Sequence, residues 1–160
     1  MNAASPEARL AATGLQIPAA PQPRGGYAPF CCSPPLGLLR LVVVSGQTCR
    51  VDGTALAGVC EAGSNLEPAR HAARVAMLNC IAALGAACEG RLSRVHQVLR
   101  VRGFIRAAAD FTEHTAVLDA ASDLLRIAFP AQPLPARTAV GAGSLPGGAW
   151  IEIEMDALMQ

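Results

Sequence analysis

The sequence has few aromatic residues and few charges. Phe, Trp and Tyr make up 4% of its 160 residues, and Asp, Glu, Lys and Arg together make up 16%. A core must therefore be built from Ala, Val, Leu and Ile. Hydrophobic residues reach 52%, which excludes a disordered chain. At this length one domain is expected, and the low charge favours buried contacts between subunits.

The chain also lacks an excess of charge of either sign, since its net charge is +1. Arginines gather modestly between Arg91 and Arg106, but Phe104 is the single aromatic residue among them. A nucleic-acid surface usually needs a larger basic excess and interleaved stacking rings. We therefore expect no nucleic-acid partner, and a ribonuclease activity is the least favoured function.

The six cysteines form no Cys-x-x-Cys pair, and no histidine lies beside them at metal-ligand spacing. We therefore expect no metal site and reduced thiols. The start of the sequence lacks an apolar secretory leader, and the apolar runs are short or interrupted by Arg40 and Arg74. These features favour a cytoplasmic protein without a membrane segment.

Two regions are expected along the chain. Residues 1–26 form an N-terminal arm or linker, with two weak helical turns from Glu7 to Leu15 and a stretch rich in Pro and Gly after them. Residues 27–160 form a single domain.

Within this domain, hydrophobic periodicity predicts two long helices and several strands. The first helix covers 66–88, with Pro68 in its first turn, and the second begins at a cap on Asp110 or Thr112 and ends before Pro130. Strands are predicted at 38–45 (buried on both faces), 95–107, 137–142 and 150–157. This pattern predicts an α+β fold, a two-layer sandwich with both helices on one face of a mixed sheet. The other face would need cover from a second subunit.

Arg137 and Glu152 are the most informative pair of residues. A strand from Arg137, a Leu-Pro-Gly-Gly connection and a return strand are expected to bring the two side chains close together. An arginine can hold a carboxylate through two hydrogen bonds, and a glutamate can position or deprotonate a water. The pair thus suggests a pocket for a small acid and a hydrolytic step. The alternative is two solvated surface charges.

Several motifs in order resemble the reactive-intermediate deaminase family, also called the YjgF or Rid family. Pro-Ala-Arg-Thr at 135–138, Leu-Pro at 145–146 and Ile-Glu-Ile-Glu at 151–154 are similar to its C-terminal signature. Tyr27-Ala28-Pro29, the strand ending in Ser45-Gly46-Gln47, the helix of 72–84 and the segment 95–111 resemble further family segments. The resemblance covers about Tyr27 to Ala157, and the length suggests a longer branch of the family.

This resemblance implies a chorismate-mutase-like fold and a homotrimer with clefts between subunits. It also implies hydrolysis of 2-imino and 2-enamino acids to ketoacids and ammonia, with no cofactor. Arg137 would anchor the carboxylate and Glu152 would position the water. The remaining implied substrate-binding residues are Tyr27 from an adjacent subunit, Ser45, Gly46, Gln47, Ala139, where many members have cysteine, and Thr115, the nearest counterpart of an asparagine.

Three functions remain open from the sequence. The first is a cofactor-free imine or enamine deaminase. The second is a trimer that binds a small carboxylate in the same cleft without turnover, and the third is a protein-interaction role for the apolar surface and the arm. Glu152 separates the first two, because only catalysis needs its carboxylate.

Overall fold

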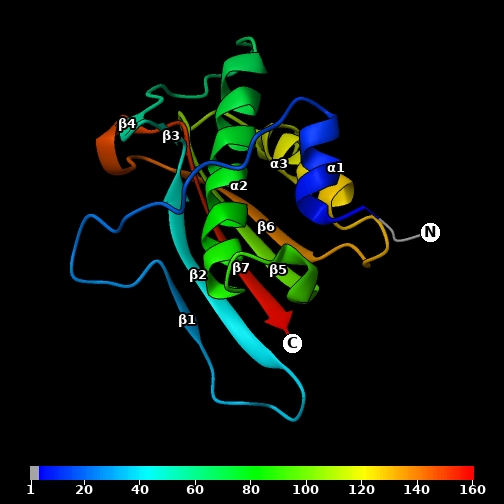
Figure 1. Cartoon of the computed structure of the whole chain (residues 1–160). Helices are drawn as coiled ribbons and strands as arrows, with labels where there is room; N and C mark the ends of the chain where they lie inside the picture. Colours follow the sequence, from blue (N-terminus) through cyan, green and yellow to red (C-terminus); the bar gives the residue numbers. More distant parts are fainter. Residues whose placement is uncertain (1–3) are drawn as a thin grey trace.

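A five-stranded mixed sheet forms one layer of the fold and helices form the other (Figure 1). The computed structural model describes residues 4–160. The strand order is β1-β2-β7-β5-β6, in which β6 runs parallel to β5 and the other neighbours are antiparallel. The strands are β1 (Phe30–Cys32), β2 (Arg40–Thr48), β5 (Val95–Arg106), β6 (Ala136–Ala142) and β7 (Ile151–Met159). The predicted mixed α+β architecture is confirmed.

The two faces of the sheet differ in burial, as the alternation along β7 predicts. Ile151, Ile153 and Met155 are fully buried under the helices, whereas Glu152, Glu154 and Asp156 are only partly buried on the other face. Successive side chains of a strand point to opposite faces, so the sequence pattern assigns each residue its side. We call the side without helices the open face.

Strand β2 corrects one expectation. The predicted strand at 38–45 was expected to be buried on both faces and to end at Gly46. Instead β2 continues through a bulge between Val44 and Gln47, and Val43 is 39% exposed on the open face. A strand with helices on one side alone needs apolar residues only at alternate positions, and here the β-branched run hid that alternation.

Two long helices cover the sheet. Helix α2 (Glu67–Ala87) confirms the predicted first helix, with Pro68 in its first turn, and its buried face is rich in alanine. Small side chains allow close packing, and Cys80 at this interface is fully buried and donates to the Ile153 carbonyl at 3.1 Å. Helix α3 (His114–Ala128) packs beside α2 and ends before Pro130, as predicted.

The start of α3 lies later than predicted. Neither Asp110 nor Thr112 caps the helix, whose first turn has no side-chain cap. The preceding segment forms a turn at residues 109–110 instead, in which the Phe111 amide donates to the Ala108 carbonyl at 3.1 Å. The Ala108 amide donates to the Cys60 carbonyl at 2.9 Å, and Phe111 is 3% exposed. Tertiary contacts of Phe111 therefore override the local capping signal.

The predicted N-terminal turns appear as α1 (Pro6–Ala12), capped by Ser5. This helix packs on α3, with Leu10 fully buried, and Glu7 accepts a hydrogen bond from the Leu92 amide at 2.8 Å. Residues 13–29 then run without helix or strand from α1 to β1, passing α2 (Figure 1). The first three residues of the predicted arm lie outside the described residues.

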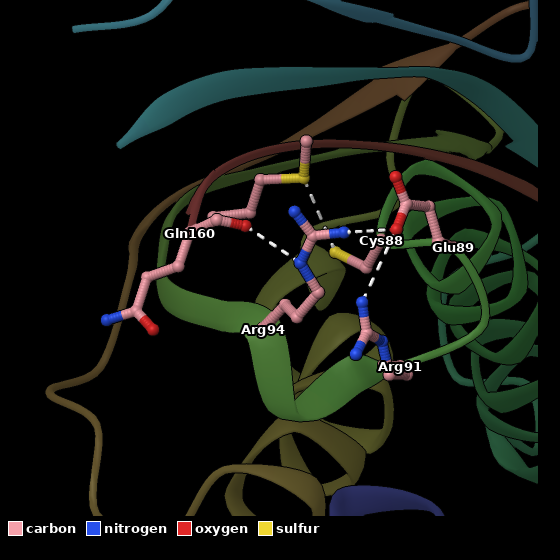
Figure 2. A network of polar contacts seen from close by, with 6 residues as sticks. Cys88, Glu89, Arg91, Arg94 and Gln160 are labelled. Carbon is pink, nitrogen blue, oxygen red and sulfur yellow. Dashed lines mark hydrogen bonds and ion pairs between the residues drawn. The ribbon is translucent and has the colours of Figure 1, made fainter. Parts of the chain in front are cut away.

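The end of α2 is tied to the end of β7 (Figure 2). The Arg94 guanidinium donates to Glu89 at 2.7 Å and to the Gln160 carbonyl at 2.9 Å, while the Cys88 thiol lies 3.7 Å from the Met159 sulfur. These contacts join the two layers at one end of the sheet. Within residues 4–160, no helix is long and apolar enough to cross a membrane.

The expected pairing between the last two strands is wrong. Strand β5 lies between β6 and β7 and pairs with both. The chain between β6 and β7 forms a short 3-10 turn at Pro146–Gly148 rather than a hairpin loop. This strand order separates the two residues that the sequence suggested as a pair.

Candidate functional site

Glu152 lies next to the bulge of β2. It is in register with Thr48 of β2 and Phe104 of β5. A Cβ atom placed on Gly46 would lie 1.9 Å from its Oε1 atom. The carboxylate therefore occupies space that only a glycine at position 46 leaves free, which explains why the Ser-Gly-Gln segment and Glu152 belong to one site.

A pocket of about 140 Å³ opens beside this carboxylate. Its walls come from the segment before β1, the end of β2 and the hairpin after it, helix α2, the turn before β7 and the start of β7. The side chains and backbone that line it include Tyr27, Gln47, Arg50, Asn79, Pro146 and Glu152. A second, wider hollow on the open face shares Tyr27, Gly46 and Glu152 with it. We refer to the first as the Glu152 pocket.

Hydrogen bonds fix the walls of this pocket. The Asn79 side chain donates to the carbonyls of Thr48 and Arg50 at 3.0 and 3.1 Å, which ties α2 to the end of β2. The Gln47 amide donates to the Ser45 carbonyl at 2.9 Å, and the Ser45 hydroxyl donates to the Ala28 carbonyl at 2.7 Å. Ser45 thus holds the segment that carries Tyr27.

The environment of Glu152 favours its protonated form. Burial raises the pKa of this carboxyl above its usual range, and the nearby charge of Glu154 raises the pKa further. The positive charge of Arg50 lowers the pKa and so opposes both effects. A carboxylate with a raised pKa is a better proton acceptor near neutral pH, which suits a general base.

Arg137 does not join this site within the chain. It is in register with the buried Val101 and so projects toward the helices, where its guanidinium donates to Asp119 at 2.7 Å and to Ser122 at 2.9 Å. Ala139 faces the same side and packs against the core, and Thr115 is exposed in the first turn of α3. The structure thus brings Tyr27, Ser45, Gly46, Gln47 and Glu152 together, and leaves Arg137, Ala139 and Thr115 elsewhere.

The other two acidic residues of β7 are paired. The Arg102 guanidinium donates to Glu154 at 2.8 Å and to both oxygens of Asp156 at 2.9 and 3.2 Å. Hydrogen bonds to Asp156, and then to Glu154, raise the pKa of Arg102. Glu154 is therefore engaged by Arg102, whereas Glu152 has no ion-pair partner among the described residues. This difference supports the choice of Glu152 over Glu154, which the spacing of the sequence could not make.

Arg50, Asn79 and Arg24 line the Glu152 pocket but were not foreseen from the sequence. The Asp52-Gly53 turn was the available signal for Arg50, because it closes the small hairpin of β3 (Arg50–Val51) and β4 (Thr54–Ala55). Asn79 was visible as a polar residue in an apolar helix. Within residues 4–160, no group of three or more His, Cys, Asp or Glu side chains is placed to hold a metal ion.

Comparison with known proteins identifies the family. The model of the family described as YjgF/chorismate mutase-like, putative endoribonuclease, matches residues 7–141. The chain belongs to this family, as its motifs predicted. It is also 34% identical to Protein TCP17 of Trypanosoma cruzi over 155 residues, which are 96% of this chain and 92% of that protein.

Solved structures share the fold. One from Shewanella oneidensis, described as a putative endoribonuclease, superposes with a TM-score of 0.84 at 31% identity and covers 96% of this chain and 99% of that one. The YjgF gene product of E. coli superposes with a TM-score of 0.59 at 20% identity, covering 88% of this chain and 94% of that one. At that identity the second likeness supports the fold alone.

Proposed function

We propose that the protein is a cofactor-free deaminase that hydrolyses 2-imino and 2-enamino acids to 2-ketoacids and ammonia. The observation that carries the proposal is the partly buried Glu152 carboxylate, with its raised pKa, at the edge of a small pocket bounded by Tyr27 and Gly46. The pocket volume of about 140 Å³ is sufficient for a small metabolite.

The chemistry needs little besides a positioned base. Glu152 accepts a proton from a water as the water oxygen attacks the C=N carbon, and the imine nitrogen gains a proton to give a carbinolamine. The protonated Glu152 then returns its proton to the amine as the C–N bond breaks and ammonia leaves. The carbinolamine hydroxyl loses its proton to the solvent as the ketone forms, and this balances the proton that the imine nitrogen took from the solvent. General-base assistance of this kind typically contributes about 10²- to 10⁴-fold in rate.

Arg137 as the carboxylate anchor stays a prediction. Its guanidinium is occupied by Asp119 and Ser122 on the helical side of the sheet, so it would have to leave these partners to bind a substrate. Ala139 and Thr115 also stay predictions as substrate-binding residues, since neither lines the Glu152 pocket.

We further propose that the protein works as a homotrimer in the reducing cytoplasm. The open face exposes Val43 and Val140, and Tyr27 is 51% exposed beside it, so a neighbouring copy could cover this surface. All six cysteines are free, as a reducing compartment would keep them. Light scattering on the purified protein measures the subunit number directly.

The test generates 2-iminopropionate in situ from an amino acid and follows ketoacid release, with semicarbazide competing for the imine. Wild-type protein should reduce semicarbazide trapping, whereas Glu152→Gln should not. Equal behaviour of the two proteins and buffer would reject the deaminase mechanism. If Glu152→Gln still binds ketoacid while wild type shows no turnover, the alternative of a carboxylate-binding trimer is favoured. RNA cleavage measured in parallel tests the activity named in the family description.

A further inference from the structure

We propose that Arg50, assisted by Arg24, binds the carboxylate of the substrate in the Glu152 pocket. This inference rests on the proposed function and supplies the anchor that Arg137 does not provide within the chain. The substrate class, a small 2-imino or 2-enamino acid with a free carboxylate, is that of the proposed function, and the new element is the pair of residues that binds its carboxylate.

The two guanidinium groups converge on one point. Arg50 of β3 donates to the Gly53 carbonyl at 3.2 Å, and Arg24, from the segment between α1 and β1, donates to the same oxygen. Both residues line the Glu152 pocket, one from the hairpin and one from the segment that passes over it. The Gly53 carbonyl itself lies in the adjoining hollow, which Arg24, Arg50 and Asp52 also line. The two guanidinium groups carry like charges and repel each other. An anion bound between them would attract both and offset this repulsion.

Neither cation has a carboxylate partner. Within residues 4–160, Arg24 and Arg50 form no ion pair, although Asp52 follows Arg50 in the hairpin turn. Arg102 and Arg137, by contrast, are each satisfied by acidic side chains. The Glu152 pocket is therefore lined by two cations that have no ion-pair partner among the described residues and can bind an external anion.

The turn before β7 keeps the Arg50 guanidinium close to the reacting carboxylate. A Cβ atom placed on Gly147 would lie 3.2 Å from an Arg50 nitrogen, so the turn at Pro146–Gly148 packs against this side chain. Arg50 also acts on Glu152 through its charge. An acid held by Arg50 would thus present its neighbouring C=N carbon toward Glu152, with the carboxylate and the base on different sides of the substrate.

The experiment compares Arg50→Ala, Arg50→Lys and Arg24→Ala with wild type on 2-iminopropionate and on its methyl ester. Arg126→Ala is the matched control, because Arg126 pairs with Asp123 on α3 and lines no part of the Glu152 pocket. Circular dichroism and thermal melting verify that each variant folds. The Arg50→Lys variant keeps the positive charge but cannot form two parallel hydrogen bonds to a carboxylate.

We expect Arg50→Ala to raise KM for the acid at least about tenfold, with little change for the ester, because a charge-assisted hydrogen bond is lost. Arg50→Lys should recover part of the loss, and Arg24→Ala should show a smaller increase. If wild type is active and Arg50→Ala leaves KM for the acid unchanged, the inference is overturned while the proposed function stands.

A binding measurement keeps the inference testable if no turnover is found. Pyruvate is titrated by calorimetry into wild type and Arg50→Ala. Binding by wild type that is at least about tenfold weaker in Arg50→Ala supports the anchor even if the deaminase proposal fails. Equal binding by both proteins, or none by wild type, overturns it.

Discussion

Arg137 and Glu152 project from opposite faces of the sheet, with β5 between the strands that carry them. Arg137 points to α3 and is held by Asp119, while Glu152 borders a pocket at the bulge of β2. The carboxylate anchor and the base suggested by the sequence are therefore not neighbours within the chain. Because the two residues are separated, the roles of Arg137 and Glu152 can be tested independently with single variants.

Replacing Arg137 with Ala should lower stability more than activity. The side chain joins β6 to α3 through Asp119, and a partly exposed pair of this kind is worth about 0.2–1 kcal/mol. A double-mutant cycle with Asp119→Ala, followed by urea unfolding, measures the coupling. If Arg137→Ala raises KM for the acid while Asp119→Ala does not, Arg137 acts as the anchor after all.

Gly46→Ala should remove activity without unfolding the protein. The new methyl group would overlap the Glu152 Oε1 atom, and this flexible side chain can rotate away while the backbone stays in place. Displacing a general base should cost at least about tenfold in kcat. Gly143→Ala is the control, since no atom lies within 4 Å of its Cβ position. Unchanged kcat in Gly46→Ala would argue against the role of Glu152.

The pH profile should report Glu152. Because burial and Glu154 raise its pKa, kcat/KM should rise with pH and level off only above the usual range of a glutamate. Arg50→Ala should shift this rising limb of the kcat/KM profile to higher pH, because Arg50 lowers the pKa of Glu152. A limb that stays in place in Arg50→Ala would contradict the proximity of the two groups.

The same raised pKa has an opposite consequence for stability. The folded state binds the Glu152 proton more tightly than the unfolded state, so this contribution is fully present below the unfolded pKa and is lost as pH rises through the folded pKa. Glu152→Gln should therefore remove that part of the pH dependence of unfolding. Urea titrations at several pH values compare the variant with wild type, and identical profiles would refute the expectation.

Arg102→Ala should lower the free energy of unfolding, because it breaks the ion-pair network on the open face. It leaves Glu154 and Asp156 without their shared partner, and hydrogen bonds to charged groups are each worth about 1.5–3 kcal/mol when well formed. Arg126→Ala, which removes an exposed pair on α3, should cost less than about 1 kcal/mol. Urea unfolding of both variants gives the comparison, and equal losses would mean that the Arg102 network adds nothing beyond a surface pair.

Local sequence patterns predicted well the long helices and strands that bury one face. The alanine-rich α2, the end of α3 before Pro130 and the alternation of Ile and Glu in β7 all follow from periodicity and proline chemistry. The cap of α3 was wrong because burial of Phe111 decides where that helix starts. The β2 bulge was missed because Ser45-Gly46 carries no strong local signal for it.

The sequence by itself determined the family, the layer architecture and the identity of Glu152 as a candidate base, since motif order and alternation are local properties. Only the tertiary structure decided which groups meet at the site. Strand order is set by how α3 carries the chain from β5 to a parallel β6, so it separates Arg137 from Glu152. Arg24, Arg50 and Asn79 meet Glu152 because a bulge, a small hairpin and a helix close one pocket, and no short-range pattern encodes that meeting.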